Sequence, residues 1–463
     1  FKQKTAYEIM PSLVGSEMCI RDSCGQLSFL TPEGVKPSWG TVGEYLELLE
    51  GQGVVVNVGT LVPHGALRAT VRGFGPGEAT EEELRKMEVL LAQGLEEGAF
   101  GISFGLIYPP GQYASTEELV RLARVLKSYG GYAAFHQRGG GPETLLRSVE
   151  EMVEVGRRAG VPVEHSHEQV HGKGDWSAIW ETVRLKEKAL KEGIAVGQDV
   201  IPYTSVCTTM AAIYPPWAQE GGLPALVARL EDPELRRRME LEVETCVPKW
   251  PPWKEGSWPV NLVRDFGWGN LYVAFVGSER NKHLEGKSLK ELGEALGKSP
   301  FQAVSDLMVA EGGAVTVLIF GISGDREDDS TLRELMRLPG RAFVTDAWET
   351  GRGRPHPGAY GAFPRVLGRY VGEGRVLRRA IESDRLFSSL IFWGPPAAPP
   401  GASDPPAPDR RDPSSAPLLS CSPATHSPYA PIIASSPPAR HRRRDVPTRS
   451  PRLQKSNAPP AFF

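Results

Sequence analysis

Apolar and β-branched runs alternate with amphipathic helical segments along most of the chain. The runs predict strands at 54–61, 99–105, 132–137, 161–167, 194–200, 271–276, 315–321 and 342–345. Leucines and alanines at three- and four-residue spacing predict helices at 81–96, 115–129, 142–160, 178–192, 288–296 and 300–311. Strands that alternate with helices form a mainly parallel sheet with right-handed crossovers. About eight such strands favour an α/β fold of the (β/α)8 TIM-like barrel type, with the open doubly wound sheet as the alternative.

One segment interrupts this alternation. Residues 214–268 are rich in Trp and Pro and hold one charged helical stretch around 223–244. The segment is longer than an ordinary connection between a strand and a helix. We therefore expect it to form an insertion over the mouth of the barrel.

The two ends of the chain differ from the middle in composition. From Pro395 onward there are 18 prolines in 69 residues, a composition that cannot bury enough apolar surface to fold, so 394–463 is predicted to be disordered. Its arginines at 440 and 442–444 are interpreted as solvated charges, because no nucleic-acid-binding motif accompanies them. Residues 1–23 show neither the helical nor the strand periodicity of apolar residues, and the run at 10–22 resembles a translated cloning adaptor. The barrel domain is therefore expected to span 24–393.

Overall composition limits the class of protein. The chain has 463 residues, of which 24% are charged, with a net charge of −3. It contains no apolar run near the ~20 residues of a membrane span, and its opening residues lack the pattern of a secretory signal. Five scattered cysteines do not suit a disulfide framework. These features predict a cytoplasmic protein without a membrane partner.

Side chains that bind metals gather where the predicted strands end. In a parallel barrel these ends share one face, which is the face that carries active sites. Histidines and carboxylates that converge there are typical metal ligands. The residues at the strand ends are His64, His136, His165, His167, Asp199 and Asp346.

Several of these residues have more than one interpretation. His165 and His167 are two apart on a strand, so both could point to the same ion, or one could line the site while the other packs. Asp346 is a candidate metal ligand, general base or helix cap. His64 alone is more often a hydrogen-bonded structural histidine than a ligand.

Basic residues near these strand ends are candidates for binding a substrate carboxylate. Arg354, His356 and Arg365 lie in a Gly- and Pro-rich loop after Asp346, and Arg138 follows His136. Each arginine could instead pair with a nearby acid. Tyr108, in a Pro-containing turn, is a candidate pocket residue together with His64 and His136. The chain has no phosphate-binding loop of the Walker type and no dinucleotide-binding glycine pattern, which disfavours kinases and dehydrogenases.

Long motifs in the middle of the chain resemble those of one enzyme family. They are NVGTLVPHGALR, GISFGLIYPPGQYASTEEL, VPVEHSHEQVHGKGDW, GQDVIPYTS, NKHLEGKSL and GRPHPGAYGAFPRVLGRYV. In this order they resemble the N-acyl-D-amino-acid deacylases, or D-aminoacylases, of the amidohydrolase superfamily. The resemblance implies a metal-dependent (β/α)8 barrel, usually joined to a small β-sandwich, that hydrolyses the amide of N-acylated D-amino acids.

The resemblance also assigns roles to individual residues. His167 matches a zinc-binding histidine, His165 replaces a residue that is usually apolar, and Asp346 matches the general base. Cys24 matches a cysteine ligand, and the family uses one or two zinc ions. The family's upstream His-x-His pair has no counterpart here, and the stretch 194–204 lacks the histidine that some members have there. The similarity ends near residue 372, so we expect the first strand and the sandwich to be incomplete.

These motifs lead to a specific expectation about function. The chain is expected to be a hydrolase of carbon–nitrogen bonds other than peptide bonds, acting on a small N-acyl amino acid by attack of a metal-activated water. No nucleic-acid partner is expected. Two alternatives remain at this point: another amidohydrolase that cleaves a cyclic amide or a dipeptide, or an inactive barrel fragment that serves as a binding scaffold.

Overall fold

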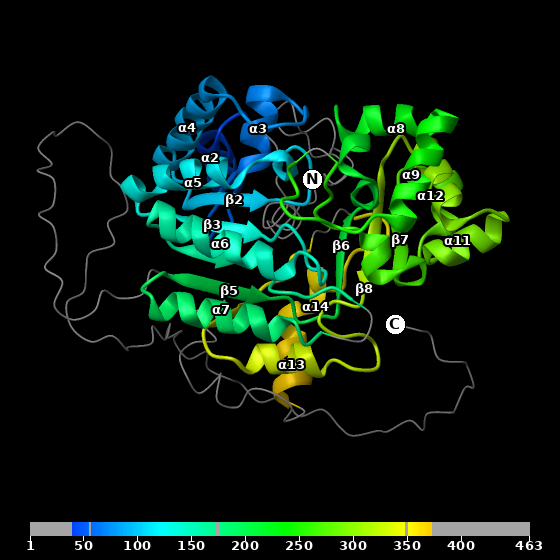
Figure 1. Ribbon diagram of the computed structural model, residues 1–463. Helices are drawn as coiled ribbons and strands as arrows, with labels where there is room; N and C mark the ends of the chain where they lie inside the picture. The colour runs from blue at the N-terminus through cyan, green and yellow to red at the C-terminus, as the bar shows by residue number, and fades with distance from the viewer. Residues whose placement is uncertain (1–38, 55–56, 173–175, 255, 348–350, 373–463) are drawn as a thin grey trace, which may run out of the picture. The chain divides into compact units, whose positions relative to one another are not determined.

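The computed structural model describes residues 39–54, 57–172, 176–254, 256–347 and 351–372 (Figure 1). All of these residues lie in one compact unit, Phe1–Ala397. The described strands form two sheets, one parallel and one antiparallel. The α/β class with a parallel sheet is therefore confirmed. No helix within these ranges is both long enough and apolar enough to cross a membrane.

The parallel sheet follows the order of the chain. Its strand order is β1-β2-β3-β4-β5-β9, and each strand pairs in parallel with its neighbour. The six strands are β1 (Val62–Pro63), β2 (Gly101–Gly105), β3 (Tyr132–His136), β4 (Val163–His165), β5 (Val196–Val200) and β9 (Arg341–Phe343). The connecting helices are α2 (Val42–Gln52), α3 (His64–Arg72), α4 (Glu81–Glu96), α5 (Thr116–Leu126), α6 (Leu145–Ala159), α7 (Ile179–Lys191) and α13 (Ser330–Arg337). Consecutive parallel strands joined by helices are the units that the alternating pattern predicted.

Local sequence signals define several of these helices. The Thr80 side chain accepts from the Glu83 backbone N–H, and the Glu83 carboxylate accepts from the Thr80 backbone N–H. These two hydrogen bonds form a capping box at the start of α4. The apolar positions of α4, α5 and α6 then face the sheet in one hydrophobic cluster that includes Leu91, Leu122 and Val153. This core holds the strand ends in register, so it fixes the positions from which the site residues project.

The antiparallel sheet corrects the prediction for two strands. The runs at 271–276 and 315–321 were expected to be barrel strands, but they form β7 (Leu271–Val276) and β8 (Val315–Phe320), which pair antiparallel with each other and with β6 (Ser205–Thr209). Apolar periodicity identifies a strand without giving its direction, which explains the error. The predicted strand at 54–61 also differs, since the described pairing there begins at Val62.

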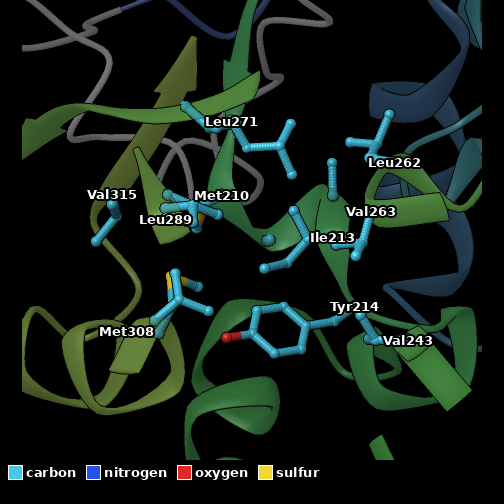
Figure 2. Packing of buried hydrophobic residues seen from close by; sticks show 14 of the residues in the cluster. Met210, Ile213, Tyr214, Val243, Leu262, Val263, Leu271, Leu289, Met308 and Val315 are labelled. Carbon is cyan, nitrogen blue, oxygen red and sulfur yellow. The ribbon is translucent and has the colours of Figure 1, made fainter. Parts of the chain in front are cut away.

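The predicted insertion is part of a larger substructure built on this second sheet. The single helix expected around 223–244 is two helices, α8 (Leu223–Glu231) and α9 (Pro233–Thr245), separated where Asp232 caps α9. With α10 (Leu262–Phe266), α11 (Leu289–Leu296) and α12 (Pro300–Ala310), they share one core. Figure 2 shows Met210, Ile213, Tyr214 and Met308 among the side chains of that core. The insertion therefore shares a hydrophobic core with the antiparallel sheet and the helices that follow it.

A short final segment closes the parallel sheet at β9. The helix α14 (Gly358–Arg365) continues into a π-helical turn at Val366–Gly372. Val366 and Tyr370 pack with Val200 of β5 and Phe343 of β9. This contact places the loop after Asp346 against the last two strands.

The two faces of the parallel sheet are distinguished by burial and register. Ala133 and Phe135 of β3 lie in the core against the helices, so Ala134 and His136 point to the other face. The register pairs Ala134 with Glu164 of β4. We call the side that bears the helices the outer face and the opposite side the inner face.

Candidate functional site

Two histidines meet at the ends of β3 and β4. The rings of His136 and His167 are 4.4 Å apart, centroid to centroid, in an edge-on arrangement. His167 is buried, and its Nδ1 has no hydrogen-bond partner among the described residues. Burial lowers the pKa of His136 well below 6.5, and the neighbouring His167 adds to that effect. The lowered pKa favours the neutral His136 imidazole, the form that binds a metal ion, and His167 Nδ1 is a buried ring nitrogen without a partner among the described residues.

Tyr108 lies beside this pair. Its ring is 5.5 Å from that of His136, and its hydroxyl lies 2.7 Å from Thr208 Oγ1. Thr208 belongs to β6, so Tyr108 joins the histidine pair to the second sheet. The sequence placed His136 among the substrate contacts, whereas the structure brings it directly against His167.

His165 does not join the pair, which corrects the prediction that it binds the metal. Its Nε2 donates to Gln137 Oε1 at 2.6 Å, and its Nδ1 accepts from Lys186 Nζ at 3.2 Å. Both ring nitrogens are therefore occupied, and His165 points to the outer face with Val163. The strand ends at His165, and His167 takes a left-handed backbone with φ 39°, so the two residues do not follow the alternation that was assumed.

Asp199 of β5 holds the backbone of this turn. Its Oδ1 accepts from the backbone N–H of His167 at 2.5 Å, and its main-chain oxygen accepts from the N–H of Glu168 at 2.8 Å. Burial raises the pKa of Asp199 to about 6, although the His167 N–H opposes the shift. The nearby charge of Asp346 also raises this pKa.

Asp346 lies beyond the end of β9, on a strained backbone. Its φ is 39°, one of three positive values among described residues other than glycine, together with His167 and Ser323. It is half-buried, and its charge also contributes to raising the pKa of Cys207 after the larger effect of burial.

Glu164 is a site residue that the sequence analysis missed. It lies on the inner face between Ala134 and Gly197, and its Oε2 has no hydrogen-bond partner among the described residues. Burial raises its pKa well above 4.5, and the charge of Asp199 raises it further. The sequence did indicate where Glu164 lies. It comes one residue before His165 in a predicted strand, and alternation along the strand places these two side chains on opposite faces.

A further contact that the sequence did not predict joins the loop after β4 to the insertion. His171 Nδ1 donates to Asp265 Oδ2 at 3.0 Å, and both residues are buried. Asp265 belongs to α10, so this pair ties the loop after β4 to the insertion. A side chain at Gly140 would lie 2.4 Å from the His171 ring, which explains the need for glycine in the loop after β3.

The expected substrate arginines differ in their availability. Arg138 is buried and fully engaged: it donates to Glu151 Oε2 at 2.6 Å and to the main-chain oxygens of Gln112 and Ala114. The prediction that it binds substrate is wrong for this reason. Arg365 stacks on Tyr203 at 4.4 Å, a structural role.

The other two predicted substrate residues lie in the loop after β9. Arg354 is exposed, and its backbone N–H donates to the oxygen of Ala274 in β7 at 2.7 Å. His356 is buried. Its Nδ1 accepts from the N–H of Gly358 at 3.0 Å, and its Nε2 donates to the oxygen of Ser205 at 2.9 Å. Because both nitrogens are occupied, His356 joins the loop to β6 and is not available to substrate.

His64 has the structural role that was considered more common. It opens α3, and its Nε2 donates to Glu118 Oε1 at 2.8 Å, while Arg68 pairs with Glu118 Oε2 at 2.5 Å. Burial alone would raise the pKa of Glu118, but His64 and Arg68 lower it to about 2. The prediction of His64 as a pocket residue is therefore corrected to a buried ion-pair network.

The described residues do not by themselves form a metal site. Among them, no three His, Cys, Asp or Glu side chains lie close enough together to hold an ion. His136 and His167 nevertheless provide two neighbouring imidazoles. Cys24, the predicted third ligand, lies outside the described residues.

Comparison with known proteins confirms the resemblance seen in the motifs. No protein-family model matches the chain. The chain is 28% identical over 342 residues to D-aminoacylase of Alcaligenes xylosoxydans xylosoxydans, and the match covers 74% of this chain and 57% of the relative. The chain thus spans somewhat more than half the length of this curated relative.

Solved structures show the same similarity in fold. A D-aminoacylase structure concerned with a binuclear metal center has a TM-score of 0.54 and 26% identity, covering 72% of this chain and 57% of that one. N-acyl-D-glutamate deacylase from Bordetella bronchiseptica, complexed with zinc and a phosphonate that mimics the tetrahedral intermediate, has a TM-score of 0.58. Its identity is 22%, with 80% of this chain and 64% of that chain covered, so it shows the fold alone. The chain is therefore similar in sequence and fold to D-aminoacylases.

Proposed function

We propose that this chain is the larger part of a zinc-dependent hydrolase that cleaves the amide bond of N-acyl-D-amino acids. The observation that carries the proposal is the pair of neighbouring imidazoles, His136 and His167, at the ends of β3 and β4. The similarity to D-aminoacylase supports the choice of reaction. The sequential order of the six parallel strands supports a (β/α)8 barrel of which they are a part.

The described residues fit a bound zinc ion. Two neighbouring imidazoles, one with a buried Nδ1 that has no partner among the described residues, are suitable donors, and His167 and His136 would hold the ion together with Cys24. Bound zinc lowers the pKa of a water ligand toward ~7 and polarises a carbonyl group. One or two zinc ions are proposed, in keeping with the zinc complex and the binuclear metal center of the similar structures.

Asp346 supplies the proton transfers in this proposal. Its carboxylate accepts the proton of the attacking water and then donates it to the leaving amine nitrogen, so the C–N bond breaks as the amine becomes neutral. Its left-handed backbone turns it away from the direction of β9, at the end of the sheet shared with His136 and His167.

Two residues would bind the rest of the substrate. Tyr108, beside His136, lines the pocket, and Arg354 is the remaining candidate for the carboxylate because Arg138 and Arg365 are engaged elsewhere. A guanidinium fork binds a planar carboxylate with two parallel hydrogen bonds. The small N-acyl amino acid would thus be held at both ends.

The experiment measures hydrolysis by the full chain with and without added zinc. N-acetyl-D-amino acids, their L-enantiomers and a cyclic imide are offered separately, and protein-bound zinc is quantified. We expect zinc-dependent release of acetate from the D-isomers. Equal rates for both enantiomers, or faster opening of the imide, would identify a different amidohydrolase reaction.

A binding scaffold is the second candidate function. It is favoured by the fact that the described residues do not bring three ligand side chains together. In that case the purified chain would contain no stoichiometric zinc and would hydrolyse none of the three substrates. Binding of an N-acyl-D-amino acid without turnover would then support the scaffold.

A further inference from the structure

The conformation of His167 conflicts with what its sequence position dictates. Residues two apart on a strand point to the same side, and His165 points to the outer face, where both its nitrogens are bound. His167 reaches His136 only because its backbone leaves the strand at φ 39°. Left-handed backbone is unfavourable for a side chain such as histidine, so something must hold it there.

Asp199 makes the contact that compensates for this strain. Its carboxylate accepts the His167 N–H at 2.5 Å, and its own carbonyl accepts the next N–H, that of Glu168, at 2.8 Å. Hydrogen bonds to an ionised acceptor are the stronger kind, and the carboxylate is buried beside the turn. The N–H groups of two successive residues, His167 and Glu168, therefore both donate to Asp199 of β5.

Glu168 secures the other side of the same turn. Its carboxylate pairs with Lys186 of α7 and with Arg341 Nη2 of β9 at 2.9 Å, all of them buried. The side chain of Glu168 is therefore bound on the outer face. His167, one residue earlier, is pulled toward the inner face by Asp199.

We propose that Asp199 is a positioning residue that holds the His167 imidazole against His136 by fixing the left-handed turn. Its relevance to catalysis rests on the proposed function, in which these two imidazoles hold the metal. The carboxylate acts through the backbone of His167 and does not itself bind the ion.

Two substitutions separate positioning from ligation. Asp199→Asn keeps an oxygen that can accept the His167 N–H, whereas Asp199→Ala removes it. Asp265→Ala is the matched control, because it removes a different buried aspartate that bonds to a different histidine, His171. Retention of the overall fold is checked from the dispersion of the amide spectrum of each variant.

The first measurement needs no metal. In the full chain with isotope-labelled histidine, the nuclear Overhauser effect between the His136 and His167 ring protons reports their contact. We expect this signal in the unsubstituted protein, in Asp199→Asn and in Asp265→Ala, and its loss in Asp199→Ala. Survival of the signal in Asp199→Ala, or its loss in Asp199→Asn, would overturn the inference.

The second measurement is the zinc affinity of the same proteins. We expect Asp199→Ala to bind zinc roughly 10–100-fold more weakly, the usual effect of losing a group that orients a ligand, with Asp199→Asn close to the unsubstituted chain. Equal weakening by both variants, with the ring contact intact, would make Asp199 a direct ligand and contradict the proposal. If the unsubstituted chain binds no zinc, the proposed function fails, while the ring contact still decides the role of Asp199.

Discussion

Buried histidine and carboxylate side chains lie on both faces of the parallel sheet, but the two faces differ in whether these side chains have hydrogen-bonding partners. On the outer face, His165, Lys186 and Glu168 satisfy one another, and Arg341 completes the group. On the inner face, His167 Nδ1 and Glu164 Oε2 are buried without partners among the described residues. Buried polar groups are normally paired, so unpaired ones mark a place where another group binds.

The pKa values follow the same division. On the outer face, burial would raise the pKa of Glu168, but Lys186 and Arg341 hold it below its ordinary value. On the inner face, burial raises the pKa of Glu164 well above 4.5, and Asp199 reinforces the shift. Charge in the outer cluster is therefore structural, whereas the Glu164 carboxyl group on the inner face is poised to hold a proton.

The largest expected effect comes from the carboxylate beyond the end of β9. Asp346→Asn removes the proposed proton acceptor at nearly constant volume, and we expect turnover of N-acetyl-D-amino acids to fall by about 10²–10⁴-fold. Steady-state kinetics measure the change, and thermal unfolding serves as the control because the amide preserves the shape of the side chain. Unchanged turnover would remove Asp346 from the mechanism.

A matched pair of substitutions tests the division between the faces directly. Glu168→Gln leaves Lys186 and Arg341 buried without their carboxylate, and we expect a loss of about 3–5 kcal/mol in the free energy of unfolding. Glu164→Gln resembles the protonated acid that burial favours, so we expect no loss at pH 7. Denaturant titration measures both, with the exposed Glu187→Gln as control. Similar losses in both variants would contradict the distinction.

Much of this arrangement follows from the sequence, and the exceptions have physical causes. Alternation of strands and helices predicted β2 to β5, and the predicted strand ends included His136 and His167, whose rings meet in the structure. The antiparallel direction of β7 and β8 was not predictable, because direction depends on which strand each one pairs with.

The wrong predictions for the site residues all concern features that only the folded chain determines. Arg138 and His356 occupy positions typical of a binding site, but their partners, Glu151 and Ser205, are 13 and 151 residues away in sequence. His165 was misassigned because a single left-handed residue reverses the alternation after the strand. Partner choice and isolated backbone turns are properties of the folded chain.

His356 gives the loop after β9 a pH-dependent stability. Burial lowers its pKa to about 4, against 6.5 for an ordinary histidine. Between these two values the unfolded chain binds a proton at His356 that the folded chain does not bind. The contribution of neutral His356 to the free energy of unfolding is therefore full above pH 6.5 and is lost as the pH falls from about 6.5 to 4. The difference corresponds to about 3 kcal/mol. In His356→Gln we expect a shallower decline of unfolding free energy over this range, measured by denaturant titration at several pH values; an unaltered slope would exclude His356 as its source.

The smallest expected effects separate the two remaining loop arginines. Arg365 stacks on Tyr203 at 4.4 Å and lies 5.6 Å from the ring of Tyr370, so Arg365→Lys should cost about 0.5–1 kcal/mol of stability and leave KM unchanged. Arg354 is exposed, so Arg354→Ala should change stability by less than about 0.5 kcal/mol. If it binds the substrate carboxylate, loss of that charge-assisted bond should raise KM about tenfold. The reverse pattern would make Arg365 the carboxylate-binding residue, whereas an unchanged KM in both variants would place that function outside the loop.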